Sequence, residues 1–198
     1  MGIACGIANS VPFVGGLKFC LAYNAVHKAF TIKPSTGRAI FYNKAVDSLV
    51  DGGYWARIDG LYILCAHTNT NGESLYNWKN PAGTTNATNF NSPIHTPDQG
   101  ILYNGTTQYT DLNFTPSVNG VNYTQNSATF GLYIRTDITS AGAHGTAGNV
   151  DVKDCFAIPR YTDDLAYARI NASSSMNKAN KVKSDRCGHI FLKRQSIK

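Results

Sequence analysis

Residues 53–80, GYWARIDGLYILCAHTNTNGESLYNWKN, decide the fold that this sequence predicts. Residues 58–65 are dense in Ile, Leu and Tyr and are followed by the polar stretch 67–72, a pattern typical of a buried strand. Trp55 and Trp78, the only tryptophans of the chain, flank this segment. We expect two large rings on either side of one strand to fix the core on which later strands pack. The stretch is therefore interpreted as scaffold, without catalytic chemistry.

The sequence before this stretch predicts one amphipathic helix. Ser35 or Thr36 serves as its N-cap, because short polar side chains satisfy the free N–H groups of a first turn. Over residues 38–50 apolar side chains recur at three- and four-residue steps, and the glycine pair 52–53 ends the pattern. Residues 17–23 alternate briefly, which suggests a short strand or an arm that lies on another surface.

The sequence after residue 73 predicts short antiparallel strands separated by turns. Asn104-Gly105 is a strong signal for a two-residue type I′ turn between two strands, and Asn119-Gly120 repeats it. Residues 139–149 are interpreted as a flexible loop. The expected strands lie at residues 74–78, 89–94, 101–103, 106–112, 129–135, 155–158, 165–170 and 189–192.

This order of elements predicts a mainly β chain, an antiparallel β-sandwich with one N-terminal amphipathic helix. An open α+β sheet is the alternative. We expect an N-terminal arm at residues 1–34 that docks on a partner, a helix-plus-sandwich domain at 35–177, and a basic segment at 178–198.

The positive charge of the chain lies at one end. The 198 residues include 18 Lys and Arg against 12 Asp and Glu, a formal net charge of +6. Seven of these basic residues and one acidic residue fall within residues 178–198, so residues 1–177 are neutral. We expect this segment to be solvated or to dock on a partner, and nucleic acid is the less expected partner.

The five cysteines lie far apart, contain no CxxC pair and are odd in number. This pattern favours free and mostly buried thiols in a protein assembled in a reducing cytosol, and Cys65 fits that description best. No secretory signal is evident at the N-terminus, and no apolar run reaches the roughly 20 residues that a membrane span needs. We therefore expect no membrane partner.

Acid–base hydrolysis needs two carboxylates at a defined separation in a cleft. The candidates are Glu73, Asp98, Asp111 and the adjacent Asp163 and Asp164. Neighbouring residues on a strand point to opposite faces, so the last two are better explained as a solvated turn. No GxSxG motif, metal-ligand histidine spacing or phosphate-binding loop is visible, and we expect no enzyme and no cofactor.

Two further patterns suggest binding rather than catalysis. Residues 69–73 (NTNGE) have the alternating oxygen ligands and glycine of a calcium loop, but neutral Asn replaces the usual Asp, which favours an Asx-turn instead. Aromatic faces stack on sugar rings, and core packing is the alternative role for each ring. The possible glycan-contact aromatics are Tyr76, Trp78, Tyr103 and Tyr109, from a pool that also holds Tyr54, Trp55 and Tyr123.

Four segments between residues 38 and 135 carry a resemblance to a known family: RAIFYNKAVDSLVDGGYWARIDGLYILCAH, SLYNWKNP, NSPIHTPDQGILYNGTTQYTDLNFTPS and NSATFGLYIRTD. They resemble a domain of virion proteins from tailed bacteriophages and prophages. Members often carry a jelly-roll or concanavalin A-like (LamG-like) sandwich. The resemblance covers about half of the chain, and its motifs form structure and turns, so it implies a fold and a virion context and no catalytic residues.

The resemblance implies a non-enzymatic structural protein of a tailed-phage virion, a head- or tail-associated fibre or decoration protein assembled in the host cytoplasm. Its expected partners are other virion proteins and copies of itself. Similar proteins continue with further strands after the segment that resembles residues 188–194. We therefore expect neighbouring copies or another virion protein to complete the sandwich, or the chain to be part of a longer product.

Two other functions stay open on the same fold. One is a carbohydrate- or receptor-binding adhesion module that contacts host surface polysaccharide. The other is a polysaccharide-degrading enzyme, for which the sequence shows no convincing carboxylate pair.

Overall fold

The computed structural model describes residues 18–136, 144–147, 154–158, 160–172, 177–179 and 188–195. The chain divides into two compact units, Met1–Asn113 and Phe114–Lys198, and each is described by itself. This division falls inside the domain predicted at residues 35–177. Of the predicted arm at 1–34 the structure describes residues 18–34, and of the basic segment at 178–198 it describes residues 178–179 and 188–195. The docking of either segment on a partner stays a prediction.

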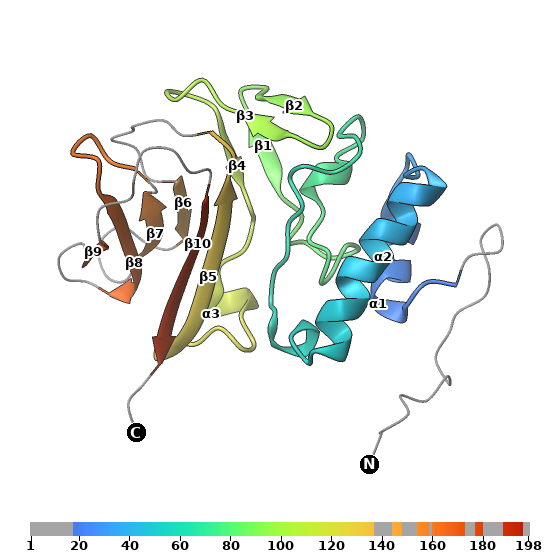
Figure 1. Cartoon of the computed structure of the whole chain (residues 1–198), viewed down its shortest axis with the longest axis horizontal. Coiled ribbons are helices and arrows are strands. Elements are labelled where there is room, and N and C mark those ends of the chain that lie inside the picture. The colour runs from blue at the N-terminus through green and yellow to red at the C-terminus, as the bar shows by residue number, and fades with distance from the viewer. Residues whose placement is uncertain are drawn as a thin grey trace, which may run out of the picture. The chain divides into compact units, whose positions relative to one another are not determined.

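Two helices form one side of the first unit (Figure 1). The predicted helix is confirmed as α2, Thr36–Asp51. The Ser35 side chain caps it by accepting the N–H of Arg38 at 3.4 Å, and the N–H of Gly52 donates to the carbonyl of Ser48 at 3.1 Å. Capping residues act within one turn of the chain, which is why this helix was readable from the sequence.

The strand or arm predicted at residues 17–23 is wrong, and so is the expectation of a single N-terminal helix. Residues Leu21–Ala29 form a second helix, α1. Its side chains Tyr23, Val26 and His27 are buried, which is the three- and four-residue spacing of a helix face. Over only four alternating residues the strand and helix periods cannot be told apart.

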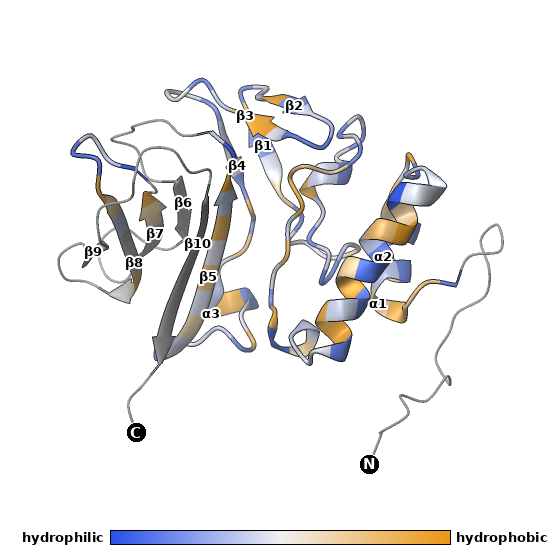
Figure 2. Ribbon diagram, in the orientation of Figure 1, coloured by the Kyte–Doolittle hydropathy of each residue, from blue (hydrophilic) through white to orange (hydrophobic). Residues whose placement is uncertain are grey.

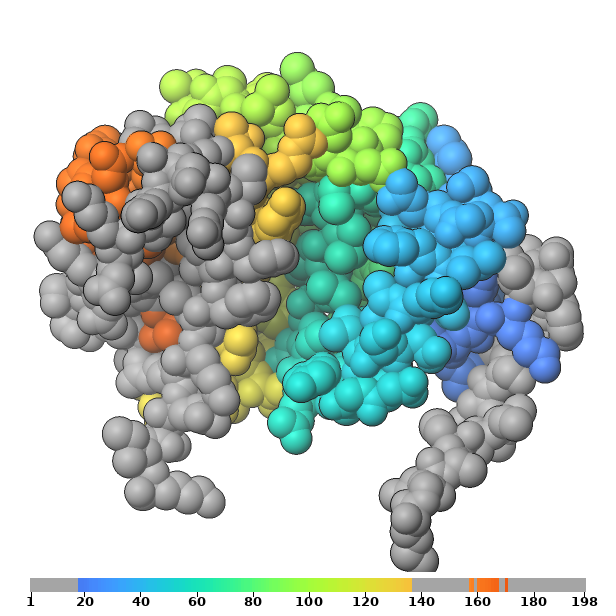
Figure 3. Space-filling view, in the orientation of Figure 1, coloured from blue at the N-terminus to red at the C-terminus, as the bar shows by residue number. Residues whose placement is uncertain are grey.

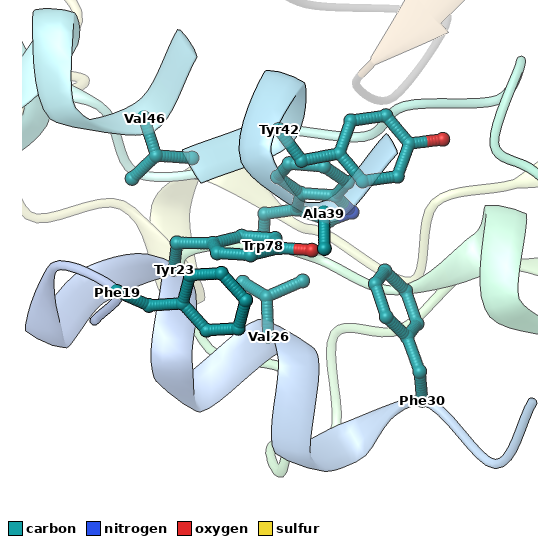
Figure 4. Close-up of a cluster of buried hydrophobic side chains, with 8 residues drawn as sticks. All are labelled: Phe19, Tyr23, Val26, Phe30, Ala39, Tyr42, Val46 and Trp78. Carbon is teal, nitrogen blue, oxygen red and sulfur yellow. The ribbon is translucent and has the colours of Figure 1, made fainter. Parts of the chain in front are cut away.

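The core of the first unit lies between these helices and Trp78 (Figure 4). Aromatic rings meet there mostly edge to face: the Tyr42 and Trp78 centroids are 5.1 Å apart at 80°. Such contacts add specificity to the apolar burial that holds the helices together. The buried members are Phe19, Tyr23, Val26, Phe30, Ala39, Tyr42, Val46 and Trp78.

The buried strand predicted at residues 58–65 is wrong, although the region does organise the first unit. Its backbone makes one isolated bridge, Tyr62 to Asn77, instead of a ladder. The Asn77 side-chain oxygen accepts the N–H of Leu61 at 3.1 Å, and the N–H of Trp78 donates to the carbonyl of Leu61 at 2.8 Å. A side-chain amide and one backbone bond thus replace a partner strand.

Two short 3₁₀ helices lie on either side of the segment 58–65. They are η2, Trp55–Arg57, and η3, Glu73–Leu75, and the second replaces the strand predicted at residues 74–78. The Tyr62 hydroxyl donates to the carbonyls of Thr85 and Leu112 at 2.8 and 3.0 Å, and burial raises its pKa to about 12. This ring ties the irregular segment to the strands that follow.

Four short strands complete the first unit. β1, Thr88–Phe90, pairs with β4, Tyr109–Asp111, and β2, Ile94–Thr96, pairs with β3, Gly100–Leu102, both antiparallel. Strands are thus confirmed in this region, but the one predicted at residues 89–94 is split. Asn91 and Ser92 between β1 and β2 have left-handed backbone angles of 59° and 53°, which a continuous strand does not tolerate.

The hairpin predicted around Asn104-Gly105 is wrong, because the strands on either side pair with other strands. A type I′ turn needs positive φ at both central residues, and of these two only Gly105 has it. Instead the Asn104 side-chain oxygen accepts the N–H groups of Thr106, Thr107 and Gln108 at 3.0 to 3.1 Å. The residues form a closed polar loop.

The second unit is built from antiparallel strands after a four-residue helix, α3, Pro116–Asn119. β5, Ser127–Ile134, pairs with β10, Gly188–Gln195, over eight residues. Along β5, half-buried Phe130, Leu132 and Ile134 alternate with exposed neighbours. The strands predicted at 129–135 and 189–192 are confirmed.

A four-stranded sheet with the order β6-β7-β8-β9 forms the rest of the second unit. The strands predicted at 155–158 and 165–170 are confirmed as β7, Asp154–Ile158, and β8, Ala166–Ala172. β6, His144–Ala147, corrects the loop predicted at 139–149, whose other residues lie outside the described ones. β9, Asn177–Ala179, was not predicted, and three residues carry too little pattern to reveal it.

The described chain therefore has few helices and short antiparallel strands in small sheets, which is a mainly β architecture. Coloured by hydropathy, α1 and α2 carry apolar segments among polar ones, and apolar segments also mark β2, β3, β7 and β8 (Figure 2).

Candidate functional site

The acid–base candidates of the first unit bind groups of their own chain. Asp98 forms an ion pair with Arg38 at 2.5 Å, and its own backbone is left-handed at 62°. Asp111 accepts the N–H of Asn113 at 2.7 Å, which is an Asx-turn. Both carboxylates thus have conformational roles.

The two adjacent aspartates of the second unit lie in the turn before β8, as predicted. Asp163 accepts the hydroxyl of Tyr167 at 2.7 Å and the N–H of Leu165 at 3.2 Å. Asp164 accepts the guanidinium N–H of Arg160 at 2.8 Å. These bonds shape the turn and hold the Tyr167 ring.

Glu73, the last member of the possible calcium loop at 69–73, turns its carboxylate into the protein. Its side chain has no exposed surface, and its oxygens accept the N–H groups of Ile32 at 3.0 Å and Asn71 at 2.8 Å. Desolvation acts to raise its pKa, but the hydrogen bonds from Ile32 and Asn71 outweigh it and the pKa is lowered. Backbone donors therefore already occupy the oxygens that a cation would need.

The described residues contain no group of three or more His, Cys, Asp and Glu side chains arranged to hold a metal ion. Cys20 and Cys65, the cysteines whose side chains the structure describes, are free thiols. Cys65 is exposed, which corrects its predicted burial: the segment 58–65 turns instead of running as a buried strand.

Two of the four predicted glycan-contact aromatics belong to the core of the first unit. Trp78 is 2% exposed and packs against Tyr42, so its ring faces are not available to a sugar. Tyr76 is half-buried against the same core, with its ring centroid 5.9 Å from that of Phe30. Neither ring forms an exposed platform.

The other two aromatics, Tyr103 and Tyr109, lie near each other in sequence but on opposite sides of the β1–β4 pair. The Tyr103 hydroxyl meets the Thr110 hydroxyl at 2.6 Å, and Thr110 donates to the Asn89 side-chain oxygen at 2.6 Å. Burial raises the pKa of Tyr103. Because neighbouring strand residues point to opposite faces, Tyr109 lies on the face away from this chain of hydrogen bonds.

Tyr109 forms the centre of the best candidate site, together with Phe90. The two residues are cross-strand partners on β4 and β1. Their rings stack with centroids 4.7 Å apart and planes 9° apart, while 39% of Phe90 and 51% of Tyr109 stay exposed. The light green atoms of this part of the chain lie at the surface in the space-filling view (Figure 3).

A hydrogen-bonded polar frame adjoins the stacked pair. The Asn91 amide donates to the carbonyl of Thr107 at 2.6 Å, and the Gln108 amide donates to the carbonyls of Asn91 and Ser92 at 3.0 and 3.2 Å. The Gln108 side-chain oxygen accepts the N–H of Asn104 at 2.8 Å. The loops that follow β1 and precede β4 are thus fixed to each other.

A pocket of about 260 Å³ lies beside α2 in the first unit. Its rim includes the ion pair of Arg38 and Asp98, and the Arg38 guanidinium lies 5.6 Å from the centroid of the Tyr42 ring. The chain's own cation and its carboxylate partner thus already satisfy each other there. The lining residues are Arg38, Phe41, Tyr42, Ala45, Ile63, Cys65, Trp78 and Asp98.

Sequence reasoning named Tyr109 but missed Phe90, Asn91 and Gln108. Phe90 lies in the strand predicted at 89–94, and its partner is known only from the register that joins β1 to β4. The unusual density of Asn, Gln and Thr between residues 86 and 110 was the available signal.

Comparison with known proteins gives no relative: no protein-family profile, no curated protein and no solved structure matches the chain. Among the described residues, no helix combines the length and the apolar composition needed to cross a membrane.

Proposed function

We propose that the chain is a non-enzymatic structural protein of a tailed-bacteriophage virion, a head- or tail-associated fibre or decoration protein that acts through subunit interfaces. It is assembled in the host cytoplasm, and its partners are other virion proteins and copies of itself. The resemblance over residues 38–135 supports the virion context.

The observation that carries the proposal is the apolar surface on the short strands of the first unit. The cross-strand partners Ile94 and Leu102 are 63% and 61% exposed. Large aliphatic side chains that face water in pairs are typical of surfaces that a partner covers. Among the described residues, β1, β2, β3 and β4 each have one hydrogen-bonded neighbour, so each offers a second edge for strand pairing.

The proposal includes an antiparallel sandwich in the second unit. The β5–β10 sheet and the four-stranded sheet are in contact, because β8 touches both β5 and β10. Ile158 on β7 and Tyr167 on β8 are cross-strand partners and are buried, with Tyr161 and Leu165 packed against them. Two sheets that bury side chains between them are the basis of a sandwich, which neighbouring subunits complete in the proposed assembly.

Incorporation into particles tests the proposal. A tagged chain is expressed during particle assembly, and purified particles are probed with antibody against the tag and imaged. We expect the tag on intact particles and a loss of incorporation when Ile94 and Leu102 are both replaced by Asn. Val118→Asn, at an exposed apolar residue of the second unit, is the matched control. A chain that stays in the unbound fraction while particles assemble normally contradicts the proposal.

A second candidate function is a receptor-binding adhesion module on the particle surface. The Phe90–Tyr109 stack favours it, since exposed aromatic rings beside fixed polar loops suit ligand recognition better than burial between subunits. The two functions are compatible, because a fibre protein can present such a surface outward.

A further inference from the structure

We propose that the Phe90–Tyr109 stack and the loops beside it bind an uncharged pyranose unit of a polysaccharide. This inference rests on the adhesion module just described and names its ligand class. The structure assigns the contact to the solvent-facing side of the β1–β4 pair, and not to the core rings Tyr76 and Trp78.

The geometry of the two rings supplies an apolar platform. Each ring packs one face on the other at a centroid separation of 4.7 Å, so their planes are fixed within 9°. Both rings keep exposed surface after this contact. A pyranose presents a face of C–H groups that stacks on such a ring, and a platform that is already ordered loses little conformational entropy on binding.

The neighbouring loops supply fixed hydrogen-bonding groups. Gln108 joins the loop after β1 to the loop before β4 through bonds to Asn91, Ser92 and Asn104. The Asn104 oxygen in turn holds three consecutive N–H groups. The side-chain amides of Asn91 and Asn104 each make one bond as donor, to Thr107, and keep a second N–H. These fixed donors can bind the hydroxyls of a sugar, which both donate and accept.

The charge of the region decides the class of sugar. Residues 86–111 contain no Lys or Arg, and Asp98 and Asp111 are their acidic residues. Asp98 is paired with Arg38, and Asp111 accepts the N–H of Asn113. A phosphorylated or uronic acid-containing polymer needs basic groups at the contact, as does a nucleic acid. The lack of basic residues therefore favours a neutral ligand.

A second copy of the chain is the competing occupant of this surface. A stable interface between proteins buries about 800 Å² on each partner, far more than two half-exposed rings provide. The polar frame of amides and hydroxyls beside the rings also differs from the aliphatic pair Ile94 and Leu102. We therefore assign the rings to sugar and the aliphatic pair to subunit contact.

Affinity electrophoresis of the full chain tests this assignment. Native gels are cast with mannan, dextran, arabinogalactan or mixed-linkage β-glucan, and alginate serves as the acidic polymer. We expect at least one neutral polysaccharide to retard the chain. Tyr109→Ala weakens this retardation at least tenfold in the apparent dissociation constant, while Tyr109→Phe retains the ring and most of the affinity.

Further variants guard against loss of folding. Phe90→Ala is expected to act like Tyr109→Ala, and Tyr133→Ala, at an exposed ring of the second unit, is the matched control with unchanged retardation. Circular dichroism and sedimentation follow the fold and the oligomeric state of each variant. Absence of retardation by every neutral polymer, equal retardation of Tyr109→Ala, or a change in oligomeric state alone overturns the inference. Particle incorporation is measured separately, so failure of the structural role is distinguishable from failure of this one.

Discussion

The buried carboxylate of Glu73 accepts the backbone N–H of Ile32 at 3.0 Å, across 41 residues of sequence. The same carboxylate holds the N–H of Asn71 at 2.8 Å. One side chain thus fastens the connection between α1 and α2 to the polar loop at residues 69–72. Glu73, the acidic residue of the possible calcium loop, thus has a structural role: it links two segments of the first unit.

We predict that Glu73→Ala destabilises the first unit by about 1.5–3 kcal/mol, the usual contribution of hydrogen bonds to a charged group. The N–H groups of Ile32 and Asn71 then lose their acceptor in a buried position. Glu73→Gln keeps one acceptor oxygen and is expected to cost less. Urea unfolding followed by circular dichroism measures both variants, and equal stability of Glu73→Ala and the parent chain contradicts the assigned role.

The same carboxylate predicts an acid-sensitive contribution to stability. Its folded pKa lies below its ordinary value of 4.5, so the ionised form stabilises the fold fully above pH 4.5. This contribution disappears as the pH falls through the lowered pKa. The difference in unfolding free energy between the parent and Glu73→Gln should therefore be constant from pH 7 to about 5 and shrink towards pH 3. A difference that does not change over this range refutes the prediction.

The Lys33 side chain binds backbone carbonyls at the C-terminal end of α1. Its ammonium donates to the carbonyls of His27 at 2.7 Å and Lys28 at 3.1 Å, and also to that of Phe30. A cation at this end of a helix is worth about 0.3–1 kcal/mol. We expect Lys33→Met to lower the unfolding free energy by that amount, whereas Lys28→Met, on the exposed side of the same helix, changes it less. Denaturant midpoints of the two variants decide the point, and equal losses exclude a special role for Lys33.

The helix α2 was readable from the sequence because each of its signals is local. Ser35 caps the N-terminus within three residues, and Gly52 ends the helix within one turn. By contrast, the segment 58–65 is held by Asn77, whose side-chain oxygen accepts the N–H of Leu61 from 16 residues away, and by the N–H of Trp78, which donates to the carbonyl of Leu61. An apolar run shows that a segment packs against something, and not which groups bind its backbone.

The candidate site shows the same division between local and distant information. Tyr109 was named because exposed tyrosines in a polar segment suit sugars. Phe90 became visible only through the β1–β4 register, which joins residues 19 positions apart. Trp78 was named as well, yet it lies in the core because two helices far from it in sequence cover it. Composition therefore identified the kind of surface but not its members.

The two tryptophans offer a direct test of this core. Trp78 is buried among Tyr23, Phe30 and Tyr42, whereas Trp55 is half-buried with the Lys79 ammonium 4.6 Å from its ring centroid. Trp78→Ala is expected to cost about 3–5 kcal/mol, and Trp55→Ala less. In single-tryptophan variants, the fluorescence of the Trp55→Phe chain should lie at shorter wavelength than that of Trp78→Phe. The reverse order of wavelengths would mean that Trp55 is the more buried ring and would contradict the position of Trp78 in the core.

Cys65 should react faster than Cys20 in the folded protein. It is exposed at the pocket beside α2, whereas Cys20 is half-buried and burial is the main cause of its raised pKa. Because the thiolate is the reacting species, both differences slow Cys20.

We expect a maleimide to modify Cys65 at least tenfold faster, as measured by mass spectrometry of peptides from quenched samples. Cys65→Ser removes this fast modification while leaving the rate at Cys20 unchanged. Equal rates at the two cysteines under native conditions show that the turn at residues 64–65 does not present the thiol to solvent.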